Sequence, residues 1–323
     1  MRLATLVLLA VAGGQAQFKS TVPLVVAPTT VTDSKGRFAD GLEAGYLILY
    51  DNNVRQPIQL DFEVYPISLV VAIQSSANSQ AVLDKLGRSG NLLAQLVAGA
   101  AGETAVITFS DEVHLRQDFT DDPDALTRVL RHLQVEGGGA VSLSAVMGAL
   151  RMLEKRPPGR RRIILTIAEK RDRSSKVKLE EVVAEAQRQN ALIYWVTYSP
   201  SLTSFTARPK TVKSDDPKEN GEPIPYDAGP MNLLAIFPEL FQLGKPDVAE
   251  LFSKATGART MGFLKRNGLE QAIEAVGAEV HRQYILTFKP GGETNGRFHP
   301  IRVAVKGRPD LEARTRAGYW PLE

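Results

Sequence analysis

The chain of 323 residues is longer than one ordinary core requires and suggests two domains, and its 43% hydrophobic and 23% charged residues are typical of a folded globular protein. A net charge of +3, from 39 basic and 36 acidic side chains, is too balanced for an electrostatic footprint on nucleic acid, so we expect no nucleic-acid partner. The absence of cysteine excludes disulfides, thiol nucleophiles and cysteine metal sites.

Residues 1–16 have the pattern of a secretory signal peptide. Arg2 supplies a positive start, residues 3–12 an apolar run, and Gly14-Gln15-Ala16 a small-x-small end that predicts cleavage after Ala16. The apolar run is too short to span a bilayer, and nothing caps or patterns it as a buried helix or strand. We therefore expect a mature chain that begins at Gln17, has no transmembrane segment and is exported, either to the periplasm or out of the cell.

Residues 17–65 have the features of an N-terminal β segment. The stretches 22–32 and 47–50 are rich in β-forming residues, and a turn at 33–36 lies after the first of them. The stretch 58–65 alternates apolar with polar or aromatic residues, with Phe62 on the apolar face, which predicts a half-exposed strand.

The pattern of the α/β region, 66–282, is organised around residues 67–79. This stretch is apolar and rich in Val and Ile up to Gln74 and then breaks into small polar residues, as a parallel strand buried on both faces does before a loop. Further buried strands are expected at 103–110, 162–168 and 191–198. Apolar stripes at helical spacing separate them, at Leu126, Val129, Leu130 and Leu133, at Leu143, Val146, Met147 and Leu150, and at Leu179, Val182, Val183 and Ala186.

This alternation predicts a doubly wound, mainly parallel sheet of the Rossmann-like kind. Ligands of such open sheets bind outside the carboxyl ends of the strands. We call these ends and their loops the sheet rim, and expect a functional site there.

The last third of the chain returns to β structure. Residues 200–230 gather Pro, Lys, Asp, Asn and Gly without periodicity, which predicts a surface insertion rather than a functional lid. Helices at 247–256 and 269–280 and a strand near 259–263 follow, and then strands at 283–288, 300–305 and 312–319. Neither β segment can bury two faces alone, so 283–323 is predicted to pair with 17–65 in one β-sandwich.

Several short sequence motifs, in a fixed order along the chain, resemble those of a known family. A Ser-rich loop after the first buried strand precedes Val106-Ile107-Thr108-Phe109-Ser110-Asp111, Gly137-Gly138-Gly139 and Ile163-Ile164-Leu165-Thr166, and this order resembles a von Willebrand factor type A domain. Val31-Thr32-Asp33-Ser34-Lys35-Gly36-Arg37, Phe62-Glu63-Val64-Tyr65, Thr256-Gly257 and Gly318-Tyr319 are similar to an exported bacterial variant, the acidobacterial VWFA-related family. The resemblance covers nearly the whole mature chain.

The resemblance implies where a metal site would lie. In the family, Asp-x-Ser-x-Ser after the first strand, a Thr in a glycine-rich loop and an Asp after a later strand coordinate a divalent ion, which keeps one position open for a partner's carboxylate. The corresponding positions here are, in that order, Gln74, Ser76, Asn78, Ala140 and Glu169. Only Ser76 keeps the family's residue type.

The departures from the family pattern predict a degenerate metal site. Gln74 is neutral, and Ala140 has no ligand atom. A shift of the first motif by one residue places Ser75 and Ser79 at two of the positions, but it leaves Ala77 at a third and supplies no aspartate. We expect no useful binding of Mg²⁺ or Mn²⁺, and no other cofactor.

Other candidate motifs have simpler interpretations. Gly137-Gly138-Gly139 lacks the Lys-Ser/Thr of a phosphate loop, and Ser142 and Ser144 lack the Gly-x-Ser-x-Gly elbow. Arg160-Arg161-Arg162 is expected to be a solvated charge run, and the adjacent Asp111 and Glu112 a strand-end turn. The histidines show no paired zinc spacing and are expected at the surface or at boundaries: His114, His132, His281 and His299.

Two classes of function remain open from the sequence. The favoured one is an exported, non-enzymatic interaction or scaffold module, with metal-dependent adhesion as its alternative. A hydrolase that uses Ser76 with a distant histidine is the other class, against which the missing elbow and base count. The partner-binding rim is expected to comprise Ser75, Ser76, Asn78, Ser79, Gly138, Gly139 and Glu169. The sequence does not indicate the partner protein or the oligomeric state.

Overall fold

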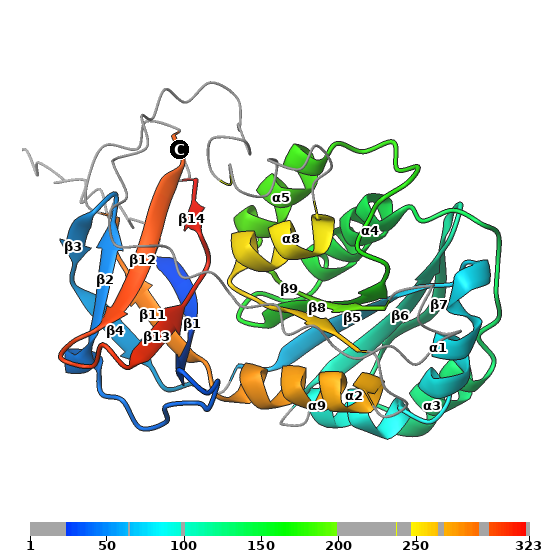
Figure 1. Cartoon of the computed structure of the whole chain (residues 1–323), viewed down its shortest axis with the longest axis horizontal. Coiled ribbons are helices and arrows are strands. Elements are labelled where there is room, and N and C mark those ends of the chain that lie inside the picture. The colour runs from blue at the N-terminus through cyan, green and yellow to red at the C-terminus, as the bar shows by residue number, and fades with distance from the viewer. Residues whose placement is uncertain are drawn as a thin grey trace, which may run out of the picture.

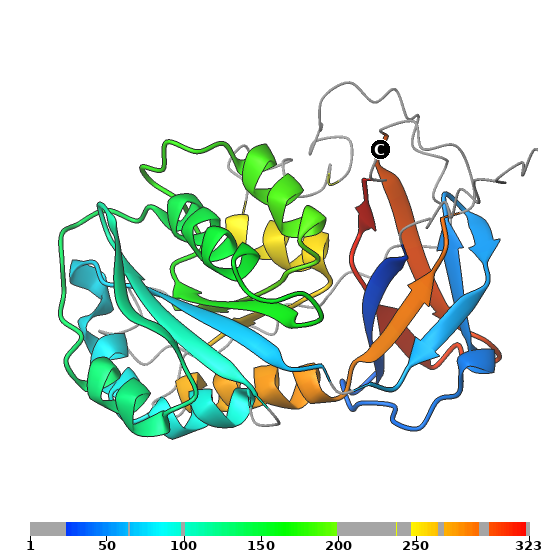
Figure 2. The same ribbon diagram turned by 180° about the vertical axis from the view of Figure 1, so that it is seen from behind.

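The computed structural model describes residues 24–63, 65–97, 101–198, 237, 247–263, 268–290 and 297–320. These residues form an α/β domain and a β-sandwich that lie side by side (Figure 1, Figure 2). The predicted fold class is confirmed, because the central sheet is mainly parallel and separate antiparallel sheets accompany it. The predicted signal peptide, 1–16, and the predicted insertion, 200–230, lie outside the described residues.

The central sheet of the α/β domain has the strand order β10-β9-β8-β5-β6-β7. Its strands are β5 (Ile67–Gln74), β6 (Glu103–Phe109), β7 (Val113–Thr120), β8 (Arg161–Ala168), β9 (Leu192–Thr197) and β10 (Thr260–Gly262). β5 lies between β6 and β8, pairs in parallel with both, and has every residue buried. Its unbroken apolar run fits this position because both of its faces are covered.

Two layers of helices cover the central sheet (Figure 1). One face is packed by α1 (Gln80–Leu86), α2 (Gly90–Leu96), α3 (Pro123–Arg131) and α9 (Gly268–His281), and the other by α4 (Ser142–Glu154), α5 (Leu179–Arg188) and α8 (Val248–Thr256). The start of α3 is capped by the Asp122 side chain, which accepts a hydrogen bond from the Asp124 N–H at 2.8 Å. A 3₁₀ turn, η2 (Ala77–Ser79), joins β5 to α1.

The β-sandwich consists of two sheets with the orders β13-β1-β11-β4 and β14-β12-β2-β3. Its strands are β1 (Val25–Asp33), β2 (Leu47–Asp51), β3 (Val54–Gln56), β4 (Ile58–Asp61), β11 (Tyr284–Phe288), β12 (His299–Val305), β13 (Leu311–Arg314) and β14 (Gly318–Tyr319), and a 3₁₀ turn, η1 (Ala44–Tyr46), precedes β2. β1 pairs with β11 and β13, and β2 with β12, so strands from both ends of the described chain complete each other. Leu49, Phe288 and Val303 belong to a core that the two sheets share.

A buried glutamate of α9 ties the two domains together. Glu279 is 0% exposed, accepts a hydrogen bond from the Tyr194 hydroxyl at 3.0 Å and forms an ion pair with Arg314 of β13 at 2.7 Å. Burial raises the pKa of Tyr194 well above its usual value, so this phenol stays a hydrogen-bond donor. Arg259 of the α/β domain also lies 3.7 Å from the Glu279 carboxylate, so arginines from both domains balance its charge.

A second tie runs from the loop between β13 and β14. The buried Arg316 donates to the Gln187 carbonyl at 2.7 Å and to Asn190 Oδ1 at 2.8 Å, both at the end of α5. Close by, Gly257 has φ +80°, and a Cβ added there would lie 2.5 Å from the backbone nitrogen of Arg316. We call Glu279, Arg314, Arg316 and Gly257 the domain seam.

Strand β7 was not anticipated from the sequence. It is the edge strand of the central sheet and runs antiparallel to β6, with register shifts near Thr104 and Val106. Its residues are half-buried or exposed in an irregular pattern. That pattern matches neither an apolar run nor strict alternation, which explains why it gave no strand signal.

Two predicted strands are wrong in extent. The expected strand at 58–65 ends at Asp61, because the Asp61 side chain accepts hydrogen bonds from the Glu63 N–H and the Tyr65 hydroxyl, and Phe62 is 83% exposed instead of lying on a buried face. The expected strand at 312–319 is divided between β13 and β14, which belong to different sheets. The division allows Arg316 to reach the α/β domain.

Candidate functional site

The side chain of Gln74 is the centre of the sheet rim. It belongs to the last residue of β5, which is 1% exposed, and it donates from Nε2 to Ser76 Oγ at 2.7 Å. Its Oε1 accepts the Glu169 N–H at 2.9 Å, which links the loops after β5 and β8. Both ends of the amide are thus engaged within the protein, as a buried polar group requires.

Glu169 carries the carboxylate of the mapped positions, and a neighbouring arginine neutralises it. The Arg173 guanidinium forms an ion pair with the Glu169 carboxylate, and Asn78 Nδ2 lies 3.4 Å from Glu169 Oε1. The backbone N–H of Arg173 donates to the Ala140 carbonyl at 3.0 Å, which joins the glycine-rich loop to the same cluster. The structure therefore brings all five mapped positions, Gln74, Ser76, Asn78, Ala140 and Glu169, into one contiguous network.

The rim serines are bonded inward. The Ser75 N–H and hydroxyl both donate to the Phe109 carbonyl, at 2.8 Å and 3.3 Å. The Ser79 hydroxyl lies 2.6 Å from the Tyr198 hydroxyl and 3.4 Å from Ser76 Oγ. Burial raises the pKa of Tyr198 to about 12, so its phenol is protonated at neutral pH.

The glycine-rich loop packs against the end of β6. The Gly138 N–H donates to Asp111 Oδ2 at 3.1 Å, and Gly137 has φ +69°, where an added Cβ would clash with the same carboxylate. The Glu136 N–H donates to the Ser75 carbonyl at 2.6 Å. Asp111 is therefore more than a strand-end turn, because it holds the loop that contains Ala140.

Only part of the predicted rim reaches the surface. Ser75, Ser76 and Ser79 are at most 2% exposed, and Glu169 is 7% exposed. Asn78 and Gly138 are exposed, and Gly139 is half-buried. The side chain of Arg173 is 42% exposed, so a partner at the rim would meet this arginine before the serines.

A divalent ion fits this set of donors poorly. Mg²⁺ needs an octahedral set of oxygen ligands with carboxylate charge, whereas Ala140 offers no side-chain ligand and the Glu169 charge is matched by Arg173. Gln74 Oε1 already accepts the Glu169 N–H, and as a neutral amide oxygen it adds no charge to offset a dication. Within the described residues, no group of three or more His, Asp or Glu side chains is placed to hold a metal ion.

Two expectations about polar residues are wrong. The arginine run is not solvated: the Arg160 side chain is 10% exposed and bonds Ser68 Oγ at 2.6 Å and the Glu103 carboxylate at 3.2 Å. His299 is a buried residue of the sandwich, where Nδ1 lies 3.1 Å from Asp51 Oδ1. Tertiary contacts supplied partners in both cases that the sequence did not indicate.

Comparisons with known proteins agree with this geometry. Residues 70–170 match the von Willebrand factor type A domain family. This part of the chain is similar to a von Willebrand factor type A domain and has the α/β fold of one. The match spans β5, α4 and β8 and reaches the Gln74, Ala140 and Glu169 positions. No curated protein matches the chain.

Solved structures with low sequence identity also match. The conserved hypothetical protein BatB from Bacteroides thetaiotaomicron is 14% identical, with a TM-score of 0.44 over 67% of this chain and 98% of that one. An aerotolerance-related membrane protein from Bacteroides fragilis is 14% identical, with a TM-score of 0.41 over 66% and 98%. The SpRpn10 von Willebrand factor type A domain is 11% identical, with a TM-score of 0.41 over 65% and 94%.

Arg173 is the rim residue that the sequence analysis missed. It lies four positions after Glu169, in a loop that has no periodic pattern. The signal that could have found it is a basic residue shortly after the strand-end acid, in a chain that has the neutral Gln74 where the family pattern has an aspartate. No helix in the described residues has the length and apolarity to cross a membrane.

Proposed function

We propose that this chain is an exported, non-enzymatic protein-interaction module whose von Willebrand factor type A domain binds a protein partner at the sheet rim without a metal ion. The observation that carries the proposal is the ion pair of Arg173 with Glu169. In the resembled family a dication balances the charge of the strand-end carboxylate, whereas here a guanidinium balances the charge of Glu169. Asn78, Gly138 and Arg173 give this surface exposed donors and acceptors for a partner.

The bonding of Ser76 supports an interaction role over hydrolysis. Its hydroxyl is buried and accepts from Gln74 Nε2 at 2.7 Å. A nucleophilic serine needs a base within hydrogen-bond reach. The histidines engage other groups or lie on another strand: His132 the Arg128 carbonyl, His281 the Leu96 carbonyl, His299 Asp51, and His114 is part of β7.

Thermal unfolding tests the absence of metal binding. We expect coincident unfolding curves in chelator and in millimolar Mg²⁺ or Mn²⁺. A bound ion would be visible in this assay, since at a hundredfold excess over its Kd it would add about 2.7 kcal/mol to the free energy of unfolding. An upward shift in the unaltered chain that disappears in a Ser76→Ala, Glu169→Gln variant would instead establish metal-bridged adhesion.

A restored variant checks the mapped positions themselves. It combines Gln74→Asp, Asn78→Ser, Ala140→Thr and Glu169→Asp with Arg173→Ala. We expect this variant to gain stability from Mg²⁺, because it regains the oxygen ligands and loses the competing guanidinium. A folded variant with no response to the ion would contradict the mapping.

Site-specific cross-linking tests partner binding at the rim. A photo-reactive benzoylphenylalanine at Asn78 should form a discrete cross-linked product in cells, and should still do so in chelator. The control position is Val54, which is 62% exposed on β3 of the sandwich. Equal cross-linking from both positions, or from neither, would contradict the proposal.

Export is tested by N-terminal sequencing of the native protein, which should begin at Gln17.

A further inference from the structure

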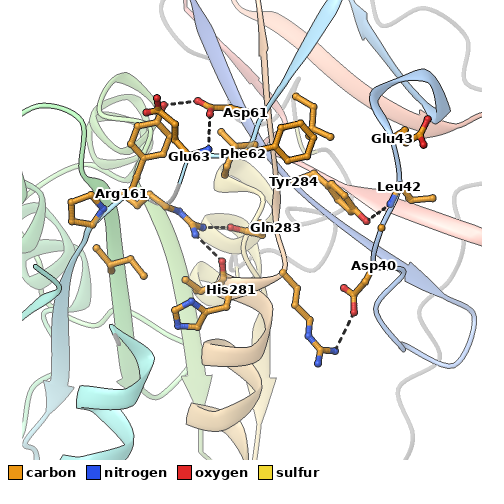
Figure 3. A pocket seen from close by; sticks show the side chains of 18 of the residues that line it. Asp40, Leu42, Glu43, Asp61, Phe62, Glu63, Arg161, His281, Gln283 and Tyr284 are labelled. Carbon is orange, nitrogen blue, oxygen red and sulfur yellow. Dashed lines mark hydrogen bonds and ion pairs between the residues drawn. The ribbon is translucent and has the colours of Figure 1, made fainter. Parts of the chain in front are cut away.

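A cavity lies between the two domains, at the end of β5 and β8 opposite to the sheet rim. Its volume is about 450 Å³, and it is lined by the loop before β2, the end of β4, residues 61–63 and 65–67, and the end of α9 (Figure 3). We call it the junction cavity. Its size falls within the range of about 300–1,000 Å³ that is usual for ligand sites.

The junction cavity has apolar walls and an exposed aromatic side chain. Leu42, Leu60 and Val280 are among the apolar residues that line it. Phe62 also lines it and, at 83%, is more exposed than the other large apolar side chains described as exposed. Leaving so much of a phenyl ring in water is unfavourable, and covering it would release about 25 cal/mol for each Å² buried.

Hydrogen bonds link residues on both sides of Phe62. The Tyr65 hydroxyl donates to Asp61 Oδ2 at 2.5 Å, and the Glu63 N–H donates to Asp61 Oδ1 at 2.9 Å (Figure 3). The first bond holds the Tyr65 side chain to the Asp61 carboxylate, and the second holds the Glu63 backbone to it. A partner that covers Phe62 therefore meets flanking residues that already have hydrogen-bond partners.

The charge around the junction cavity is negative. Four carboxylates, Asp40, Glu43, Asp61 and Glu63, line it against the guanidinium groups of Arg161 and Arg282. The Tyr65 hydrogen bond lowers the pKa of Asp61, which keeps that carboxylate ionised.

The two guanidinium groups are already engaged. Arg161 donates to the Val280 carbonyl at 2.7 Å and to Gln283 Oε1 at 2.5 Å, and Arg282 lies 3.9 Å from Asp40. Glu43 and Glu63 are exposed and have no ion pair among the described residues. The carboxylate excess is therefore available to a cation from outside.

We propose that the junction cavity is a docking site for a segment of a partner protein in which a large apolar side chain stands next to Arg or Lys. The apolar walls and Phe62 take the apolar side chain, and Glu43 and Glu63 take the cation. Complementary charge would steer the encounter and select against acidic segments. This site goes beyond the proposed function, because it lies at the other end of the strands from the rim and requires no rim residue.

Two labelled peptides test the proposal by fluorescence anisotropy with the purified full chain. The first is Gly-Arg-Leu-Arg-Phe-Gly, and the second has Glu in place of each Arg. We expect the arginine peptide to bind at least about tenfold more tightly, with an affinity that falls as salt rises. Equal affinity for both peptides, or binding of neither at millimolar concentration, would overturn the proposal. Binding of neither peptide is also the result expected if a second copy of the chain covers Phe62.

Matched variants locate the binding. Phe62→Ser and Glu63→Gln change exposed side chains, so their unfolding curves should match that of the unaltered chain, while each weakens the arginine peptide on the order of tenfold. The controls are Leu115→Ser, at a residue 57% exposed on β7, and Glu112→Gln, at an exposed carboxylate near it. If the control variants weaken peptide binding as much as Phe62→Ser and Glu63→Gln do, the assignment to the junction cavity is wrong.

Discussion

The sheet rim and the domain seam both gather charged side chains, but they bury them to different extents. In the seam, Glu279 has a side chain 0% exposed and is paired with an arginine from another domain. At the rim, the side chain of Glu169 is 9% exposed, and its arginine, which is four residues away, is 42% exposed. The seam charge is thus held between domains, whereas the rim charge is held locally and its arginine stays in contact with water.

This difference indicates separate roles for the two regions. A buried ion pair that loses one member leaves an uncompensated charge and costs much stability, whereas an exposed pair contributes little. The seam is therefore suited to fixing the two domains against each other. The rim can exchange the water around Arg173 for a partner's groups at small cost.

The largest expected effect comes from removing the seam charge. Glu279→Gln keeps the shape of the side chain but leaves Arg314 without its anion, and should lower the free energy of unfolding by about 3–5 kcal/mol. The matched control is Glu154→Gln, whose carboxylate is 51% exposed and pairs with Arg188, with an expected loss below about 1 kcal/mol. Urea unfolding measures both, and similar losses in the two variants would remove the contrast in burial.

A smaller effect is expected from the glycine at the seam. Gly257→Ala must adopt a positive φ and also moves Cβ to within 2.5 Å of the Arg316 nitrogen, so we expect a loss of about 2–4 kcal/mol. Gly307→Ala is the control, because Gly307 has φ +70° with no atom within 4 Å of the added Cβ, and should lose about 1–2 kcal/mol. Equal losses would show that the close approach of the two domains contributes nothing.

The smallest effect is expected at the rim. Arg173→Gln removes the ion-pair partner of Glu169 but leaves the Gln74 and Asn78 bonds in place. We expect a loss of about 1 kcal/mol, measured by thermal unfolding. Arg171→Gln, at an exposed residue of the same loop, is the control and should be neutral. A loss as large as that of Glu279→Gln would mean that the rim, like the seam, is a structural tie.

The sequence predicted the rim better than the seam, for a physical reason. Gln74 ends β5 and Glu169 follows β8, and parallel strands bring their carboxyl ends to one edge of a sheet. Ala140 lies in the loop before α4, and only the family resemblance grouped it with the other two. Arg316 and Glu279 meet across domains from elements with unrelated patterns. No local periodicity encodes such a pairing.

The sequence by itself determined the alternation of buried strands and helical stripes, the completion of early β strands by late ones, and the residue types at the positions that the resemblance maps to a metal site. These follow from the type and spacing of residues along the chain. Only the tertiary structure decided that Arg173 pairs with Glu169, that the arginine run is held at half-buried contacts, that 312–319 is divided between two sheets, and that Phe62 stays exposed beside a cavity. Each of these depends on which side chains from distant segments come within hydrogen-bond or van der Waals distance, and packing alone sets those distances.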